Sequence, residues 1–300
     1  MTMPRPRLSP APPPGGGPLR NPPQMSEATF RRLTVLVRDK CGIALAPSKR
    51  QMLQTRLSRR LKAAGVDDFD AYQALLTGPN PPEGEMQAFV DCVVTNETSF
   101  FRERPHFDFL TPQRLGELAE GGRAGQLSMW SAACSTGEEV WTMAMAAEAA
   151  STALPEAGRW SWSAVATDIS IKALTQARTA IYETRDVAKV PPEMAARYVM
   201  RARDGASAAV RMAPALRRHV RFGQINLMHP RYLPGRLMDI IFCRNVLIYF
   251  DNDVQQQIVR KLCTHLRPGG LLFLGHSDMS RERQAPLRLL RNNIHERLED

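Results

Sequence analysis

The sequence predicts an α/β protein whose main element is a parallel β-sheet flanked by helices. Three apolar runs, residues 127–132, 163–167 and 238–243, have the length and composition of buried strands, and a helical pattern follows each of them. Each run ends in small or polar residues. Because ligands bind outside the carboxyl ends of the strands in such sheets, we expect the three strand ends to share one cleft.

The amino-terminal segment 1–24 contains nine prolines and three consecutive glycines, with almost nothing apolar to bury. This composition is typical of a disordered tail. The segment also lacks the apolar stretch of a signal peptide.

From Ser26 to about Phe89 the pattern is helical, so we expect an all-α amino-terminal domain over residues 25–94. Ser26 can begin a helix, because its side chain can accept a hydrogen bond from the first turn. The apolar residues that follow recur at three- and four-residue spacing: Phe30, Leu33 and Val37. Further helices are expected over 48–64, 69–76 and 86–93.

The helix expected over 48–64 presents two stripes. One stripe is apolar and contains Leu53, Leu57, Leu61 and Ala64, whereas the other is basic and contains Lys49, Arg56, Arg59 and Arg60. The basic stripe is either a solvated outer face or a docking face for an acidic helix. Under both interpretations its side chains are expected to be exposed.

We expect the sheet domain to span residues 95–300. The expected elements are strands at 127–132, 163–167, 238–243 and 271–275 and helices at 138–150, 170–181 and 253–266. Residues 190–222 interrupt this rhythm with short strand-like stretches at 198–200, 209–212 and 220–222, and Asp204-Gly205 is a turn candidate. A small antiparallel insertion explains them. The segment after Ser280 is too polar to assign.

The formal net charge of +10 raises the question of a nucleic-acid partner. The basic residues are spread over several regions without interleaved aromatic residues, so we expect no nucleic acid, and an acidic protein partner fits the same charge.

The five cysteines lie apart inside apolar segments, which predicts neither a disulfide framework nor a metal site and favours the cytoplasm. No window of 18 apolar residues predicts a membrane span.

The residues after the first strand allow two interpretations. Ser135 and Glu138 form the pattern of a capping box, which would explain both without a ligand, but it leaves Glu139 unexplained. Alternatively, the small side chains let a ligand approach the backbone at the start of a helix. The single glycine of this turn, Gly137, excludes a dinucleotide-binding loop.

Two further strand ends carry polar groups. Asp168 either caps the next helix or accepts two hydrogen bonds from the vicinal hydroxyls of a ribose. Arg244 and Asn245 follow the strand at 238–243, and Tyr249 lies on the same loop. In isolation Asn245 can occupy a left-handed turn and Tyr249 can simply pack. Three polar strand ends at once favour a shared binding site.

With these motifs the chain resembles the CheR-type chemotaxis receptor methyltransferases. The matching segments, in the family's order, are residues 95–103, 130–139, 166–169, 226–227, 243–250 and 271–277. The resemblance runs from about Ser26 to at least Ser280. It implies a Rossmann-like S-adenosylmethionine-dependent methyltransferase fold with a small antiparallel β-subdomain insertion, preceded by the helical domain. It also implies methyl transfer from S-adenosyl-L-methionine to glutamate side chains of chemoreceptors, which leaves S-adenosyl-L-homocysteine, by a cytoplasmic monomer.

The resemblance also implies roles for individual residues. Asn96, Thr98 and Arg102 hold the methionine end of the cofactor, one of Glu138 and Glu139 meets its amino-acid or sulfonium region, Asp168 its ribose, and Asn226 and Leu227 its adenosine. Arg244 and Asn245 line the cleft beside the sulfonium, Tyr249 lies close to the transferred methyl, and the two catalytic candidates are Arg102 and Tyr249. Arg56, Arg59 and Arg60 would face the acidic methylation helices of the receptor.

Two departures from the family pattern stand out. Cys134 replaces another small residue, which changes little, and segment 201–209 lacks the glycine-rich loop of members that dock on a receptor's carboxyl-terminal peptide.

The implied reaction needs no general base, because a glutamate carboxylate is already a nucleophile at neutral pH. The alternatives are a signalling module that binds the cofactor or a receptor without turnover, and a methyltransferase that acts on another substrate such as nucleic acid.

Overall fold

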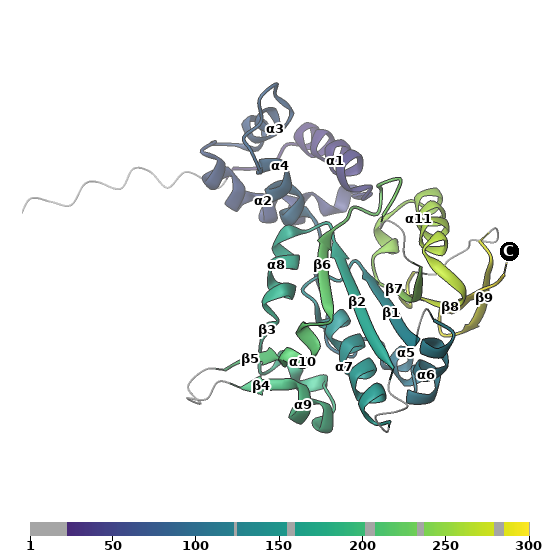
Figure 1. Cartoon of the computed structure of the whole chain (residues 1–300). Helices are drawn as coiled ribbons and strands as arrows, with labels where there is room; N and C mark the ends of the chain where they lie inside the picture. The colour runs from purple at the N-terminus through teal and green to yellow at the C-terminus, as the bar shows by residue number, and fades with distance from the viewer. Residues whose placement is uncertain are drawn as a thin grey trace, which may run out of the picture.

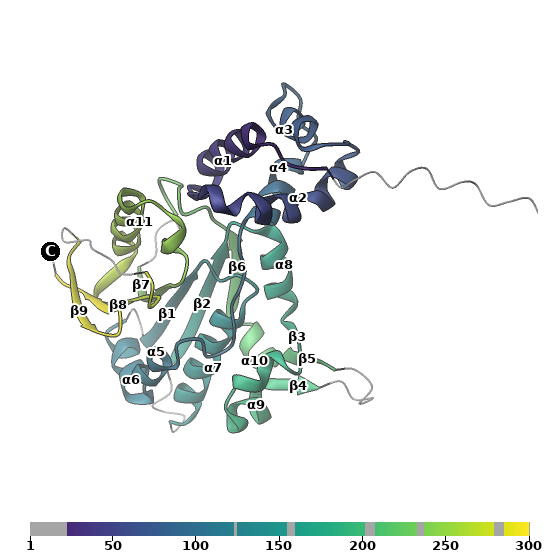
Figure 2. The same cartoon turned by 180° about the vertical axis from the view of Figure 1, so that it is seen from behind.

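The computed structural model describes residues 23–122, 125–154, 160–201, 208–232, 237–278 and 285–299 (Figure 1). The expected tail over 1–24 lies almost entirely outside this range. Helices at the amino terminus stand over one end of a sheet, and a second, smaller sheet lies toward the other end (Figures 1 and 2). No described helix combines the length and apolar character needed to cross a membrane.

The amino-terminal helices match the periodicity of the sequence. They are α1 (Glu27–Cys41), α2 (Arg50–Ala64) after the 3-10 turn η1 (Pro47–Lys49), α3 (Phe69–Thr77) and α4 (Glu85–Val93). As expected, Ser26 caps α1, because its side chain accepts the N–H of Thr29 at 3.1 Å. Leu33, Val37, Leu53 and Leu57 are fully buried in a separate core formed by these helices.

The main sheet has the order β6-β2-β1-β7-β8-β10-β9. The five strands at one side run parallel: β6 (Val220–Gln224), β2 (Ser161–Asp168), β1 (Gln126–Ala132), β7 (Met238–Cys243) and β8 (Leu266–Leu274). The last two, β10 (Ile294–Arg297) and β9 (Leu287–Arg291), are antiparallel. The parallel α/β sheet predicted from the three apolar runs is therefore confirmed.

Helices cover both faces of this sheet and create two cores. They include α5 (Arg104–Phe109), α6 (Pro112–Glu120), α7 (Glu138–Thr152), α8 (Ile171–Thr179) and α11 (Asn252–Thr264). Successive strand residues point to opposite faces. Met129 thus packs in the core that contains α6 and α7, whereas Trp130 packs in the core that contains α11.

Three details differ from the sequence prediction. Residues 220–222 belong to the edge strand β6 of the main sheet, not to the insertion. The small antiparallel sheet instead has the order β3-β5-β4, and its strand β3 (Ile181–Glu183) begins where the helix was expected to end. Its other strands are β4 (Val199–Arg201) and β5 (Ala209–Met212); the 3-10 turn η4 (Asp186–Lys189) and helices α9 (Pro192–Tyr198) and α10 (Pro214–Arg217) flank them.

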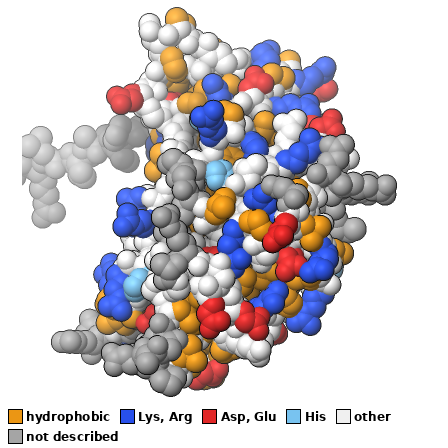
Figure 3. All heavy atoms as spheres, turned by 45° about the vertical axis from the view of Figure 1, so that its right-hand side comes forward, with side chains coloured by type: hydrophobic (Ala, Val, Ile, Leu, Met, Phe, Trp, Pro, Cys, Tyr) orange, Lys and Arg blue, Asp and Glu red, His pale blue; other side chains and the backbone are white. Residues whose placement is uncertain are grey.

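The unassigned carboxyl-terminal segment forms the third difference. Within the described residues it contributes the hairpin β9–β10, which extends the sheet. The turn candidate Asp204-Gly205 lies outside the described residues. In Figure 3, described basic side chains are scattered over the visible face among acidic and apolar ones.

Candidate active site

A cleft opens where the carboxyl ends of β1, β2 and β7 meet the amino-terminal helices. Counting the open solvent at its mouth, it contains about 840 Å³ of space that no protein atom occupies. Ten of the residues predicted from the sequence line it: Asn96, Thr98, Arg102, Glu139, Asp168, Asn226, Leu227, Arg244, Asn245 and Tyr249. The expectation that the three strand ends share one cleft is confirmed.

The loop after β1 has an unusual backbone. Ala133 and Ser135 have positive φ angles of 79° and 52°, and Gly137 has a φ of 100°. A Cβ on Gly137 would lie 2.8 Å from the Tyr182 hydroxyl, so both the φ angle and the space require glycine. Helix α7 begins with Gly137 as its N-cap and no capping side chain.

The capping-box interpretation of this turn is therefore wrong. The Ser135 hydroxyl donates to the carbonyl oxygen of Asn96 at 2.8 Å, and Glu138 accepts a hydrogen bond from the Thr136 hydroxyl at 2.6 Å. Ser135 thus ties the β1 loop to the linker, the segment 94–103 that connects α4 to α5, instead of capping α7. The backbone of this loop is exposed to the cleft without a large side chain in front of it.

Asp168 holds the ends of β1 and β2 together. One of its carboxylate oxygens accepts the N–H of Ser135 at 2.8 Å and the other accepts the N–H of Ser170 at 2.9 Å. The N-cap of α8 is Ser170, whose side chain accepts the N–H of Ala173, so the interpretation of Asp168 as the N-cap is wrong. Burial raises the pKa of Asp168, while its backbone hydrogen bonds oppose this shift. A carboxylate has about four acceptor sites, and the backbone N–H groups of Ser135, Ile169 and Ser170 occupy three of them, so one remains for a ligand hydroxyl.

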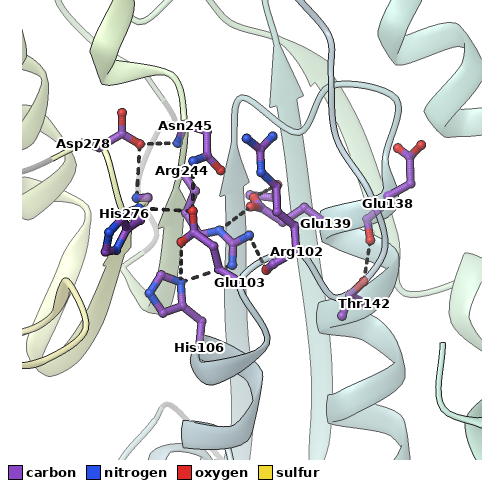
Figure 4. A network of polar contacts seen from close by, with 12 residues as sticks. Arg102, Glu103, His106, Glu138, Glu139, Thr142, Arg244, Asn245, His276 and Asp278 are labelled. Atoms are coloured by element: carbon purple, nitrogen blue, oxygen red, sulfur yellow. Dashed lines mark hydrogen bonds and ion pairs between the residues drawn. The ribbon is translucent and has the colours of Figure 1, made fainter. Parts of the chain in front are cut away.

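A buried ion pair joins β7 to α7 at the floor of the cleft. The Arg244 Nε lies 3.1 Å from a carboxylate oxygen of Glu139, whose other oxygen accepts the Ser131 hydroxyl at 2.7 Å. Burial raises the pKa of Glu139 and Arg244 opposes the shift. Figure 4 shows Glu139 pointing toward Arg244, with Glu138 on the other side of the helix. The structure therefore brings Glu139, but not Glu138, into the cleft.

Two further contacts fix the guanidinium of Arg244. Its Nη2 donates to the carbonyl oxygen of Arg102 at 2.6 Å, and its Nη1 lies 3.2 Å from Nδ1 of His106. The Nε2 of His106 lies 2.6 Å from the carbonyl oxygen of Asn292, so it carries the proton and Nδ1 is the acceptor. Burial and Arg244 lower the pKa of His106. The imidazole is therefore a neutral support for Arg244.

The linker and the end of α1 form one wall of the cleft, through residues 94–98, Arg102 and Cys41. Arg102 donates to the carbonyl oxygen of Glu97 at 2.8 Å. Asn226 donates to the carbonyl oxygen of Lys40 at 2.7 Å, and the N–H of Ala44 bonds to the carbonyl oxygen of Tyr249 at 2.9 Å. Tyr249 lies on the 3-10 turn η5 (Leu247–Tyr249). Residues of both domains thus contact each other around the cleft.

Sequence analysis missed three residues of this region: Glu103, His106 and Asp278. Glu103 accepts hydrogen bonds from Asn245 Nδ2 at 2.9 Å and from the N–H of His276 at 3.1 Å. Glu103 stands in the motif at 95–103, and this could have signalled a role. His106 and Asp278 carry no such signal, because their partners are distant in the sequence. His276 lies in an exposed turn.

The basic stripe of α2 is not uniformly exposed, which corrects the sequence prediction. Arg60 pairs with the buried Glu85, whose carboxylate also accepts the Tyr72 hydroxyl at 2.6 Å. Arg56 donates to the carbonyl oxygen of Val93 at 2.5 Å and to the Thr95 hydroxyl at 3.0 Å. Of the three predicted receptor contacts, only Arg59 is exposed, whereas Arg56 and Arg60 are half-buried. Arg56 and Arg60 therefore support the fold of the helical domain and the linker.

The chain matches two family models along most of its length. Residues 28–94 match the all-alpha domain of CheR methyltransferases, and residues 96–294 match the SAM binding domain of CheR methyltransferases.

Curated relatives carry the same description. The chemotaxis protein methyltransferase of Escherichia coli strain K12 is 41% identical over 254 residues, which cover 85% of each chain. That of Salmonella typhimurium strain LT2 is 41% identical over 255 residues, 85% of this chain and 84% of that protein. Chemotaxis protein methyltransferase 2 of Pseudomonas aeruginosa is 37% identical over 238 residues, 79% of this chain and 81% of that protein.

Proposed function

Because this chain belongs to the CheR methyltransferase family, as its motifs indicated, we propose that it methylates chemoreceptors on glutamate side chains, forming glutamate methyl esters. The cofactor is S-adenosylmethionine. The observation that carries the proposal is the cleft shared by three strand ends and both domains, with the buried carboxylates of Asp168 and Glu139 in its wall.

The residues of this cleft fit the cofactor. Asp168 retains an acceptor site for a ribose hydroxyl, and Glu139 offers a carboxylate to the cationic methionine end. The half-buried Ile169 and Ile225 and the buried Leu227 offer an apolar wall for the adenine. Asn96, Thr98 and Arg102 supply polar groups from the linker for the ammonium and carboxylate. Asn226 would contact the adenosine.

The structure supports a different role for Arg244 from the one implied by the family resemblance. Its guanidinium is held by Glu139, the Arg102 carbonyl and His106. A free cation beside a sulfonium would repel it, whereas the adjacent carboxylate of Glu139 reduces this repulsion. We therefore assign Arg244 to holding Glu139 and the linker in place, while Asn245 and Tyr249 line the cleft nearer the reaction.

The reaction places modest demands on the protein. The bound cofactor supplies an electrophilic methyl group, and the substrate carboxylate is the nucleophile, so no general base is needed. Tyr249 and Arg102 would orient the carboxylate in line with the methyl and the sulfur. The linker and the end of α1, which close the cleft, would exclude water while opposite charges neutralise.

The chemical bond formed in the reaction tests this proposal. Incubation with S-adenosylmethionine labelled in its methyl group and chemoreceptor cytoplasmic fragments should label the receptor, and mild base should release the label as methanol. A carboxylate ester hydrolyses under these conditions, whereas a methylated amine or nucleobase does not. Base-stable label would show another substrate class, and cofactor binding without any label on a receptor would favour a non-catalytic module.

We expect Arg59→Glu to slow receptor methylation several-fold at low salt. Arg59 is the exposed member of the basic stripe on α2, and reversal of its charge replaces attraction to an acidic receptor helix by repulsion. The effect should shrink as salt screens charges over about 8 to 10 Å. The measurement is the methylation rate at low and high salt, together with the cofactor Kd, which should not change.

Arg31→Glu is the matched control, because it makes the same charge change on an exposed face of α1. Equal slowing by both variants would indicate a general effect of net charge. Wild-type rates for Arg59→Glu at both salt concentrations would leave the basic stripe as a solvated face.

A further inference from the structure

The loop after β7 carries three residues of the proposed site, Arg244, Asn245 and Tyr249, and a residue outside the cleft holds its backbone. The loop runs from Arg244 to Phe250, and Asn245 adopts a left-handed conformation with a φ of 57°. Asp278, which follows β8, accepts the N–H groups of Asn245 and Gly275 on one carboxylate oxygen. Its other oxygen accepts the N–H of Ile248 at 3.1 Å. Figure 4 shows Asp278 directed at Asn245 from the neighbouring strand end.

The hydrogen bonds from Asp278 hold the backbone of the loop at Asn245 and at Ile248. Asn245 and Ile248 are three residues apart, so one carboxylate fixes the backbone that leads directly into Tyr249. The side chain of Asn245 is fixed separately by Glu103, at 2.9 Å. A Cβ on Gly275 would lie 2.5 Å from both the Asn245 nitrogen and a carboxylate oxygen of Asp278. The glycine therefore allows the two loops to approach this closely.

A contribution to stability does not explain why a buried carboxylate stands at position 278. Its exposed fraction is 1%, and the partners described above are backbone N–H groups, not a cation. Burial raises the pKa of Asp278, while these N–H groups oppose the shift. A buried carboxylate costs free energy unless its hydrogen bonds are well made. What it provides is a set of charge-assisted bonds with fixed geometry between two loops.

We propose that Asp278 is a positioning residue for methyl transfer, which acts by holding the backbone of Asn245–Ile248 so that Asn245 and Tyr249 keep their places in the cleft. It does not line the cleft itself. This inference rests on the proposed function, because it assumes that Tyr249 lies beside the transferred methyl.

The variant Asp278→Asn tests the proposal. It keeps the size of the side chain but turns one acceptor oxygen into an NH2 group, which faces a backbone N–H and cannot bond to it. We expect kcat for receptor methylation to fall at least tenfold, while the Kd of S-adenosylmethionine changes less than threefold. Hydrogen exchange of the amides in 245–248 should become at least tenfold faster. Asp253→Asn, the same change at an exposed position of α11, should leave all three values unchanged.

The outcomes separate this inference from the proposed function. Wild-type protein that methylates no receptor would refute the proposed function, whereas the exchange measurement would still report whether Asp278 holds the loop. A folded Asp278→Asn variant with unchanged kcat, or unchanged amide exchange, would overturn the inference. So would a loss of activity matched by an equal loss of cofactor-binding sites, because that pattern means partial unfolding.

Discussion

Replacing Arg244 by methionine is expected to abolish detectable cofactor binding and methylation and to lower the free energy of unfolding by about 3 to 4 kcal/mol, the cost of breaking a buried ion pair. Methionine fills a similar volume, so the loss comes from the contacts. Glu139 would remain buried without its cation, and the carbonyl oxygen of Arg102 and Nδ1 of His106 would lose their donor. Denaturant unfolding and calorimetric titration with S-adenosylmethionine measure the two effects.

A double-mutant cycle separates the effect of the buried charges on stability from the role of Glu139 in cofactor binding. Glu139→Gln combined with Arg244→Met removes both buried charges, so most of the lost stability should return. Cofactor binding should stay impaired, because Glu139 is also the proposed partner of the cationic methionine end. An Arg244→Met variant as stable as the wild type would show that the ion pair is not what holds the floor of the cleft.

The central sheet could be predicted from the sequence because its strands are buried on both faces. β1, β2 and β7 consist mainly of apolar and small residues, and β7 is buried at every position. This signal is local. The hairpin β9–β10 is different: Arg288, Arg291 and Glu296 interrupt its apolar residues, and it is a strand pair only because β8 offers an edge. β6 was assigned to the wrong sheet for a related reason, since its five residues do not reveal which strand they will pair with.

Much of the site could be predicted because parallel strands deliver their ends to one edge. Asp168 is the last residue of β2, and Arg244 and Asn245 come directly after β7, so their positions in the chain imply their positions in space. The partners within the site could not be predicted. Glu139 and Arg244 lie on different elements far apart in the sequence, and no local pattern shows that they pair.

The same limit explains the error at α2. Helical periodicity correctly placed Arg56 and Arg60 away from the Leu53–Leu57 stripe, but a helix has more than one buried side when other elements pack on it. Glu85 on α4 and the carbonyl oxygen of Val93 occupy the face that the pattern assigned to solvent. Helical periodicity shows which side chains face one apolar core. It does not show whether another element packs on a different face of the helix.

Replacing Asp168 by alanine is expected to weaken S-adenosylmethionine binding by about 1.5 to 3 kcal/mol, the scale of hydrogen bonds to a charged group. This corresponds to a Kd roughly 10 to 150 times higher. The carboxylate keeps about one acceptor site for a ribose hydroxyl after it accepts the N–H groups of Ser135, Ile169 and Ser170. Calorimetric titration of the folded variant measures the change.

Because Asp168 also organises the start of α8 through the N–H of Ser170, the loss of affinity needs a control that disturbs this helix start without removing the carboxylate. Ser170→Ala is that control: it deletes the N-cap of α8, whose hydroxyl accepts the N–H of Ala173. It should cost about 1 kcal/mol of stability, as is usual for a cap, and leave the cofactor Kd within about twofold, a change of about 0.4 kcal/mol. If the two variants weaken binding equally, Asp168 acts through loop order alone and the ribose must bind elsewhere. If only Asp168→Ala weakens binding, disturbance of the start of α8 is not the cause, and the carboxylate or its bond to the Ser135 N–H accounts for the loss.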